Sequence, residues 1–365
     1  MSSKLPIYDC ELMESEKPEI QQNVALAPLT TLGVGGIARF FVRAESVSDV
    51  EAAVAFTRER RLPLFVLGGG SNLLVSDQGW AGLVLRIGVL GIEERHEKSK
   101  TVFQVGAGVE WDDFVAHCVA RTCGGIECLS GIPGSVGGTP VQNVGAYGQE
   151  VSETIVSVLT FDLEENRVRE LTAAECGFSY RGSIFNGSQR GRYIILRVTY
   201  NLACDIKPSL GYADLQKHFV GRDGTPSLNE VRDAVLAIRA SKGMLLTAGD
   251  PDSRSAGSFF KNPVLSAAQH EELVRRAEER GLDVPSYPAL SQQRKVSAAW
   301  LVENSGFKKG YVQGKAGISS KHALAIVNLG EATAADIVAL KDEIQAGVEL
   351  AWGLHLEPEP VFVGF

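Results

Sequence analysis

Three segments of this chain carry residues whose types and spacing suit the binding of a phosphate or the transfer of a proton. The first is a glycine loop, Gly68-Gly69-Gly70-Ser71-Asn72, which follows a short apolar run. Backbone N–H groups of such a loop can surround a phosphate, and the missing side chains permit the close approach that a diphosphate needs. The loop matches neither a Walker A motif nor a G-x-G-x-x-G that opens a helix. Alone, it is explained equally well as a tight turn.

The second segment, Gly131–Gly148 (GIPGSVGGTPVQNVGAYG), is dense in glycine and proline and has no periodicity. A loop of this length inside a compact domain is uncommon unless it has a function. Its hydrogen-bonding groups are uncharged, whereas a disordered surface loop would carry more Lys and Glu. They suit a large cofactor that has ring edges and a diphosphate, and they belong to Ser135, Thr139, Gln142 and Asn143.

The third segment, Gly257–Pro263 (GSFFKNP), places Ser258 between a glycine and two aromatic residues. Serine is a poor acid at its ordinary pKa, so a catalytic role would require a strongly basic acceptor such as a carbanion. The pattern alone is explained better by a capped turn before a helix. No G-x-S-x-G motif or Ser/His/Asp pattern is present.

The secondary-structure elements that position these segments alternate between strands and helices near the start of the chain, which is typical of an α/β domain. We expect Ser48 and Glu51 to form a capping box, and likewise Ser227 and Glu230. The predicted strands are Ile37–Ala44, Leu64–Leu67, Leu83–Arg86, Val102–Val105, Ile155–Leu163, Arg167–Leu171, Tyr193–Leu202, Ala323–Leu329 and Leu356–Gly364. Two predicted helices begin at these capping boxes and end at about Arg60 and Ser241. The other predicted helices are Trp111–Val119, Ala267–Arg280, Val296–Glu303 and a long one that begins after Thr333 and ends near Gly353.

Composition and charge exclude several classes of protein. The 365 residues predict two or three domains of ordinary globular composition, with glycine (39 residues) above its usual share of about 7%. The net charge of −8 argues against a nucleic-acid protein with a broad basic face. No apolar run reaches membrane-spanning length, and the acidic N-terminus is unlike a secretory signal. These features predict a cytoplasmic protein that binds neither nucleic acid nor membrane.

The six cysteines have irregular spacing, with no C-x-x-C pair and no zinc or iron–sulfur pattern, so no metal site is predicted. We interpret them as reduced thiols in a reducing compartment. They are Cys10, Cys118, Cys123, Cys128, Cys176 and Cys204.

Taken together, the motifs resemble the UDP-N-acetylenolpyruvoylglucosamine reductases, a family of flavoenzymes of bacterial peptidoglycan synthesis. The resemblance runs from Asn23 to the C-terminus, and the order and spacing of the blocks are specific although each block is weak alone. SLGYADL (Ser209–Leu215) resembles the tyrosine loop of the type I branch. The other blocks are LTTLGVGG, VLGGGSNLLV, the Gly131–Gly148 loop, YRGSIF, SAGSFFKNP, SAAWLVENSGFKKG and LEPEPVFVG.

The resemblance implies a vanillyl-alcohol-oxidase-like α+β fold with non-covalent FAD. Two FAD-binding subdomains are expected at 1–87, joined by a returning strand at 357–365, and at 88–244, with a substrate-binding domain at 245–356. The implied reaction has two stages. NADPH first passes hydride to the flavin; the enolpyruvyl ether of UDP-N-acetylglucosamine then takes the same cleft and accepts the hydride at C3. We also expect a monomer.

The resemblance also implies roles for single residues. Ser258 aligns with the serine that protonates C2, and Arg181 with the arginine that stabilises the enolate. Glu359 aligns with an assisting glutamate. It could help by sharing a proton or by orienting Ser258 or a water molecule, because a bare carboxylate would repel an enolate. The implied substrate contacts are Tyr180, Tyr212, Lys242, Asn262 and Asn304. The implied cofactor contacts are Gly68, Gly69, Gly70, Ser71, Asn72, Gly131, Ile132, Gly134, Ser135, Gly138, Asn143, Gly145 and Arg239.

Two departures from the family pattern affect these assignments. The linker KGMLLTAGDPDSRSAGS is longer than usual, which loosens the register between Lys242 and Ser258. Phe362 stands where the family has an arginine, which can re-aim Glu359.

Two alternatives stay open. Another FAD enzyme of this fold, such as a sugar or alcohol oxidase, would lack the Ser–Arg–Glu set; neither glycine loop has a histidine to which flavin could be linked. A catalytically silent nucleotide-sugar sensor would have lost Ser258 or Arg181.

Overall fold

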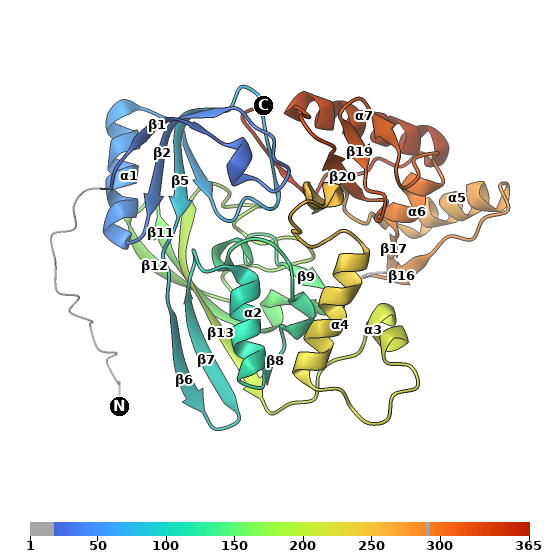
Figure 1. The fold of residues 1–365 in the computed structure, drawn as a ribbon, viewed down its shortest axis with the longest axis horizontal. Coiled ribbons are helices and arrows are strands. Elements are labelled where there is room, and N and C mark those ends of the chain that lie inside the picture. The colour runs from blue at the N-terminus through green and yellow to red at the C-terminus, as the bar shows by residue number, and fades with distance from the viewer. Residues whose placement is uncertain (1–17, 290–291) are drawn as a thin grey trace.

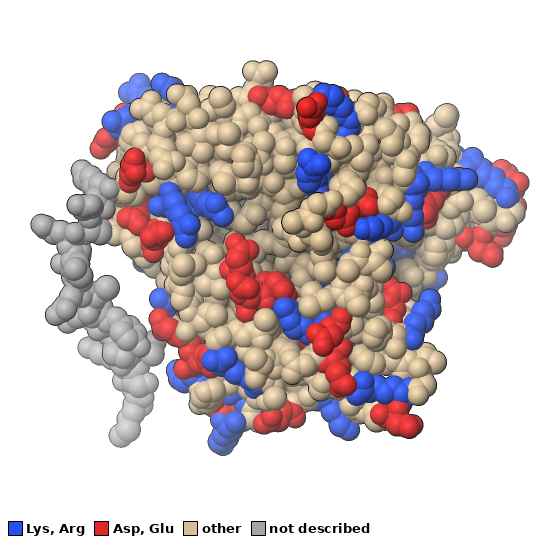
Figure 2. Space-filling model, viewed as in Figure 1, with Lys and Arg blue, Asp and Glu red and all other residues tan. Residues whose placement is uncertain are grey.

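The computed structural model describes residues 18–289 and 292–365, which form a first, a middle and a third part along the chain (Figure 1). In the view of Figure 1 the first part lies at the upper left, the middle part below it and the third part at the upper right. No helix in the described ranges is long and apolar enough to cross a membrane. Acidic and basic side chains are mixed over the face in Figure 2, with no continuous basic surface there.

The first part is a four-stranded sheet with one long helix, and its strands follow the order β1-β2-β5-β3. The strands β2, β5 and β3 run parallel, and β1 pairs antiparallel with β2. The elements are β1 (Gln21–Ala25), β2 (Ile37–Ala44), α1 (Val47–Arg60), β3 (Leu64–Leu67), β4 (Leu73–Val75) and β5 (Trp80–Ile87).

Helix α1 begins earlier than the predicted capping box of Ser48 and Glu51 allows. Ser46 is the N-cap: its side chain accepts from the Asp49 N–H, and the Asp49 carboxylate accepts from the Ser46 N–H. Both serines have an acidic residue three positions later, so the pattern alone does not decide between them. The box of Ser227 with Glu230 is confirmed at the start of α4.

The middle part is an antiparallel sheet with the order β12-β11-β13-β7-β6, and β8 pairs with the end of β13. Helices α2 and α4 pack on each other, and α3 packs on α4. The elements are β6 (Ile92–Glu97), β7 (Lys100–Gly106), α2 (Trp111–Ala120), β8 (Cys123–Gly124), β9 (Gly145–Ala146), β10 (Gln149–Glu150), β11 (Ile155–Asp162), β12 (Arg167–Thr172), β13 (Tyr193–Cys204), α3 (Ala213–His218) and α4 (Leu228–Ser241).

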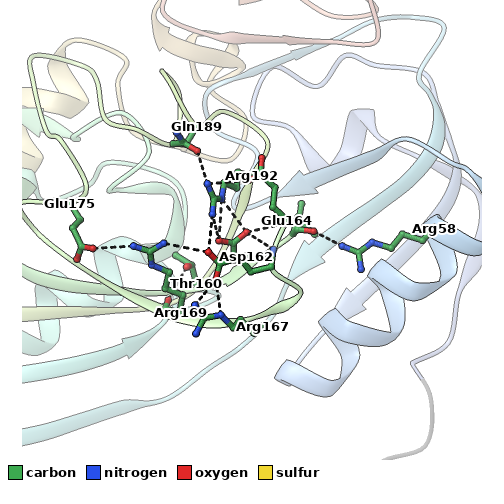
Figure 3. A network of polar contacts seen from close by, with 11 residues as sticks. Arg58, Thr160, Asp162, Glu164, Arg167, Arg169, Glu175, Gln189 and Arg192 are labelled. Carbon is green, nitrogen blue, oxygen red and sulfur yellow. Dashed lines mark hydrogen bonds and ion pairs between the residues drawn. The ribbon is translucent and has the colours of Figure 1, made fainter.

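The predicted hairpin between β11 and β12 is held by a polar network (Figure 3). Asp162 is fully buried and accepts hydrogen bonds from Arg192 Nε (3.1 Å) and Nη2 (2.7 Å), which hold the pKa of Asp162 at about 2. Arg58 of α1 reaches the same turn, donating to Asn166 Oδ1 at 2.5 Å and to the carbonyl of Leu163. The turn therefore links the first and middle parts.

The third part contains a four-stranded sheet, β14-β20-β19-β18, and a three-stranded sheet, β15-β17-β16. The predicted helix from Val296 begins only at Ala298, because Ser297 caps it and Val296 belongs to a strand. The elements are β14 (Ser255–Ser258), β15 (Val264–Leu265), α5 (Ala267–Glu278), β16 (Ser286–Pro288), β17 (Arg294–Val296), α6 (Ala298–Glu303), β18 (Val312–Gln313), β19 (Ala316–Ile318), β20 (Ala325–Asn328) and α7 (Ala334–Trp352).

The chain finally returns to the first part. Strand β21 (Val361–Val363) pairs in parallel with β4, which directly follows the Gly68–Asn72 loop. In addition, the carboxylate of Asp77 accepts hydrogen bonds from the Ala334 and Ala335 N–H groups at 2.8 and 3.0 Å. A residue of the first part therefore caps helix α7 of the third.

Two large hydrophobic cores cross these divisions. One joins Leu83 and Leu85 of the first part to Phe103 and Phe114 of the middle part. The core of the third part includes Leu74. Burial of apolar surface, the main favourable term in folding, therefore fastens each part to its neighbour.

The expectation that all cysteines are reduced is wrong for one pair. Cys123 and Cys204 form a disulfide, because the pairing of β8 with β13 brings their Cα atoms to 4.0 Å. A separation of 81 residues gives no local spacing by which sequence could reveal this pair. Cys118, Cys128 and Cys176 are free and buried, and Cys10 lies outside the described residues.

Candidate active site

The two glycine loops close directly on each other. A Cβ on Gly69 would lie 2.5 Å from Gly134 Cα and 2.8 Å from Ser135 N. Gly134 has a φ of +126°, and a Cβ there would lie 2.7 Å from Ser71 Oγ. Both positions therefore require glycine, for space and, at Gly134, also for backbone conformation. The structure brings the first two predicted segments into one place.

A cavity of about 280 Å³ opens beside this junction. The hydroxyl of Ser135 is buried there without a hydrogen-bond partner in the described part of the chain. Burial raises the pKa of Glu110, an effect that Arg86 opposes and Asp113 reinforces. An unpaired buried hydroxyl beside the partly exposed Gly68 and Gly69 is what a bound polar group would satisfy. The lining residues are Arg43, Gly68, Gly69, Arg86, Ile87, Gly88, Leu90, Gly108, Val109, Glu110, Asp113 and Ser135.

Arg239 lies under the second loop. It is 8% exposed, and a Cβ on Gly131 would lie 3.3 Å from its Nε. Its Nη2 donates to the Met244 carbonyl at 2.8 Å, but its buried Nε has no partner among the described residues. Burial lowers the pKa of Arg239, opposed by the nearby Tyr147 and Asp112. The buried Nε–H of Arg239 is therefore an unused donor.

Asn143 and Asn72, by contrast, use their side chains within the protein. Asn143 donates to Glu150 (2.8 Å) and to the Ser179 carbonyl (3.0 Å), and accepts from the Ser152 N–H. Asn72 donates to Gln142 and to the Glu359 carbonyl, which fastens the first loop to the second and to the C-terminal segment. Their side chains thus stabilise the loops themselves.

The structure brings Arg181 and Glu359 together from opposite ends of the chain. Arg181 Nε lies 3.3 Å from a Glu359 oxygen, while its Nη2 donates to the Gly145 carbonyl at 2.6 Å. Its Nη1 lies 4.0 Å from Glu150. Arg181 is 19% exposed, so the guanidinium is held in a fixed orientation with part of its surface open. It also has a φ of 55°, in the turn between Ser179 and Gly182.

Ser258 ends strand β14 beside Glu359. The Glu359 N–H donates to the carbonyl of Phe259 at 2.9 Å, and Phe260 forms a bridge with Pro358. The Ser258 side chain is half-buried and its Oγ has no hydrogen-bond partner within the described ranges. Burial raises the pKa of Glu359, although Arg181 and Lys261 oppose the rise. One region therefore contains the free hydroxyl of Ser258, the fixed guanidinium of Arg181 and the Glu359 carboxyl, whose pKa is raised.

Tyr180 and Asn262 flank this region. The Tyr180 ring lies under Lys295 Nζ (4.5 Å) and Arg181 (5.2 Å). Burial raises the pKa of Tyr180, and this rise is partly offset by the charge of Arg181 and by a hydrogen bond with Asn262. Asn262 Oδ1 also accepts the N–H of Ala298 at the start of α6. Lys295 was not predicted as a site residue, because a lone lysine carries no motif.

Tyr212 and Lys242 lie in a second cluster with Tyr147 and Asp214. The rings of Tyr212 and Tyr147 are 5.2 Å apart, and Lys242 Nζ lies 5.7 Å from the Tyr147 ring. Lys242 forms a 2.6 Å ion pair with Asp214 of α3. Burial lowers the pKa of Lys242, but Asp214 and the tyrosines outweigh it and the net shift is upward. Tyr147 was missed; an aromatic residue inside a glycine-rich loop was the available signal.

Asn304 is not joined to either cluster by a contact. It ends helix α6, and its side chain donates to the Trp300 carbonyl at 2.8 Å. Its observed role is the capping of its own helix.

Comparison with known proteins agrees with this geometry. Residues 38–171 match the FAD binding domain family, and residues 250–363 match the family described as UDP-N-acetylenolpyruvoylglucosamine reductase, C-terminal domain. The reductase of that name from Thermobifida fusca is 48% identical over 94% of this chain and 98% of its own. The one from Streptomyces avermitilis is 45% identical over 93% of both chains. The crystal structure of the reductase from Thermus caldophilus matches with a TM-score of 0.65 and 26% identity, over 95% of this chain and 99% of its own.

Proposed function

This chain belongs to the UDP-N-acetylenolpyruvoylglucosamine reductase family, and we propose that it uses FAD and NADPH to reduce the enolpyruvyl ether of UDP-N-acetylglucosamine to UDP-N-acetylmuramate. The reductase activity, in the synthesis of peptidoglycan precursors, and the flavin-binding domain follow from the family. The observation that carries the proposal is the meeting of Arg181, Glu359 and the Ser258 strand beside the two glycine loops.

The residues present fit FAD. The junction of Gly69 with Gly134 leaves backbone N–H groups without side chains over them, and the unpaired Ser135 hydroxyl adds a donor. The free Nε of Arg239 is a further donor close to Gly131. When bound, FAD supplies the transfer of hydride from NADPH to C3 of the substrate. In this proposal the other glycines of the expected cofactor site contribute backbone groups only; they are Gly68, Gly70, Gly138 and Gly145.

Arg181 holds the substrate carboxylate and stabilises the negative charge that develops when C3 accepts hydride. A guanidinium suits a planar carboxylate because it can donate two parallel hydrogen bonds. Its orientation is already set by Gly145 and Glu359, so little reorganisation is needed during the reaction.

Ser258 donates the proton that C2 receives. A carbanion delocalised into a carboxylate is basic enough to take a proton from a serine hydroxyl, and the Oγ of Ser258 has no competing acceptor in the described part of the chain. Glu359 assists by sharing a proton or by orienting Ser258 or a water molecule. Burial raises its pKa, which favours the protonated form, and an ionised carboxylate would repel the developing enolate.

Tyr180, Tyr212, Lys242 and Asn262 contact the substrate in this proposal, with Lys242 on the diphosphate and Tyr212 on the loop of a type I enzyme. Asn304 is retained as a substrate contact, although its side chain caps α6. The proposal also includes a cytoplasmic monomer and a three-part division at 1–87 with 357–365, 88–244 and 245–356.

Anaerobic stopped-flow absorbance at the oxidised flavin band tests the proposal. NADPH is mixed with the protein first, and UDP-N-acetylenolpyruvoylglucosamine second. We expect bleaching and then a recovery that depends on the second substrate. Bleaching without recovery would contradict the substrate assignment, and a protein that takes up no FAD would contradict the whole proposal.

A further inference from the structure

Helix α2 begins beside the second glycine loop, Gly131–Gly148, and its first residues contact that loop. Glu110, the N-cap of the helix, forms an antiparallel bridge with Ser135. The N–H of Trp111 donates to the carbonyl of Gly134 at 2.9 Å. The start of α2 is therefore tied to the loop at two neighbouring points.

Asp112, the next residue of α2, holds the first residue of the same loop. Its Oδ1 accepts the N–H of Gly131 at 2.5 Å. Gly131 has a φ of +70°, and a Cβ there would lie 2.5 Å from the side chain of Leu245 and 2.8 Å from that of Leu236. Side chains therefore fill the space beside the Cα of Gly131, and the carboxylate of Asp112 fixes its N–H.

Arg232 of α4 binds both oxygens of the Asp112 carboxylate. Its Nη1 lies 2.6 Å from Oδ1, and its Nη2 lies 2.7 Å from Oδ2. Two parallel hydrogen bonds between planar groups fix orientation as well as position. The Arg232 side chain is only 15% exposed, which shields the pair from water. Asp112 is thus carried by one helix, oriented by another, and bonded to the loop.

The charge of Asp112 also faces Arg239, which is the donor that the proposed function gives to FAD. Burial raises the pKa of Asp112. Hydrogen bonds from Arg232 and from the Gly131 N–H, together with the charges of Arg232 and Arg239, outweigh this effect, and the net shift is downward. A Cβ on Gly131 would lie 3.3 Å from Arg239 Nε. Gly131 therefore adjoins both the ionised carboxylate and the arginine.

We propose that Asp112, held by Arg232, is a positioning residue for FAD: it fixes the start of the second glycine loop and thereby the placement of the loop backbone relative to Arg239. This inference rests on the proposed function, which puts the cofactor beside the glycine loops. Groups that are ordered before a ligand arrives cost less on binding, so a fixed loop raises affinity. Asp112 itself is not among the described residues that line the cavity beside the loops, and it acts through Gly131.

Release of flavin from the diluted holoenzyme, followed by the fluorescence of free FAD, tests the inference. Asp112→Asn removes the charge and turns an amide NH₂ group toward a donor of Arg232 or of Gly131. We expect flavin to leave this variant about tenfold faster than wild type, since hydrogen bonds to a charged group are lost. Arg232→Gln should have a similar effect, and Arg232→Lys, which keeps the charge, a smaller one.

Asp162→Asn is the matched control. Asp162 also binds an arginine, Arg192, through both oxygens and accepts backbone N–H groups, but it holds the turn between β11 and β12. Because Asp162 is fully buried, we expect the urea midpoint of Asp162→Asn to fall at least as far as that of Asp112→Asn, with flavin released at the wild-type rate. Equally fast release from both variants would show general destabilisation and overturn the inference.

Wild-type release from Asp112→Asn also overturns it, and fast release from Asp112→Asn with wild-type release from Arg232→Gln overturns the role of Arg232. If Asp112→Asn does not fold, the two Arg232 variants decide the question, because they leave the carboxylate in place. The measurement needs neither NADPH nor the enolpyruvyl substrate, so a negative result leaves the proposed reaction standing. A wild-type protein that holds no FAD overturns the proposed function as well.

Discussion

At the scale of single residues, the pairing of Arg181 with Glu359 controls the charge of the site. Burial raises the pKa of Glu359 by more than the positive charge of Arg181 lowers it, so the net shift of the pKa is upward. The same guanidinium lies within 4.0 Å of Glu150. A cation set between two carboxyl groups is restricted in rotation, and in the proposed reaction this restriction would orient it for the substrate carboxylate.

Ser258→Ala should separate the two stages of the reaction. We expect the variant to oxidise NADPH at the wild-type rate and to turn over the enolpyruvyl substrate about 10²-fold more slowly, because only the second stage uses the proton of Ser258. Stopped-flow absorbance measures both stages. Ser266→Ala, which alters the cap of α5, is the control. Wild-type speed in the second stage of Ser258→Ala would show that the serine is only a turn residue.

Glu359→Gln should change how stability depends on pH. The folded protein binds the Glu359 proton more tightly than the unfolded chain, whose carboxyl has the ordinary pKa of 4.5. Wild-type stability therefore falls as pH rises from 4.5 through the raised pKa, and glutamine removes this loss. We expect the urea midpoint of Glu359→Gln, measured relative to that of wild type, to increase as the pH is raised from 4 to 8.

Glu357→Gln, which alters an exposed carboxylate paired with Lys261, is the control for that series. The same trend with pH in both variants would show that burial of Glu359 is not its cause.

Most site residues that sequence analysis predicted lie inside motifs; Arg239 and Lys242 are exceptions. Ser258, Arg181 and Glu359 stand in blocks with recognisable order, although they are far apart in the chain. Lys295 and Asp214 were not predicted as site residues, because each is a single polar residue without a pattern. Only the folded structure shows that they contact other site residues.

At the scale of elements, the start of α7 depends on residues far apart in sequence. Thr333 caps the N–H of Asp336, and Asp77 accepts the N–H groups of Ala334 and Ala335. Three of the unpaired donors at the helix N-terminus are thus satisfied, two of them by a carboxylate that also complements the helix dipole.

Asp77→Ala should lower the free energy of unfolding by about 1 kcal/mol, as expected when a cap is lost. Urea denaturation measures it. The neighbouring exposed Gln78, changed to alanine, is the matched control because its side chain caps no helix. An equal loss in both variants would show that the contact of Asp77 with α7 contributes nothing.

Long elements with clear periodicity or caps were predicted with nearly correct bounds, as β2, α4 and α7 show. Two-residue strands such as β8 and β9 were not predicted, because so few residues have no periodicity. Val296 was predicted as helical, but its pairing with Ser286 makes it part of β17. Tertiary pairing overrides local preference in such short segments.

At the scale of the whole molecule, the Cys123–Cys204 disulfide joins the end of the middle sheet to the segment after α2. Alkylation of the unfolded, unreduced protein followed by peptide mapping tests it. We expect these two cysteines to remain unmodified until reductant is added, while Cys118, Cys128 and Cys176 react at once. Modification of all five without reductant would show that the bond is absent in solution.

The pairing of β4 with β21 also sets the order of events during protein synthesis. Within the described residues β21 is the partner of β4, and β4 continues directly from the first glycine loop. The ribosome makes β21 only after the entire third part. Domains generally fold as they are synthesised, N-terminal first. Here, however, the nascent first part lacks the strand that pairs with β4 until translation has passed residue 363, so the surroundings of the first glycine loop can be completed only after that.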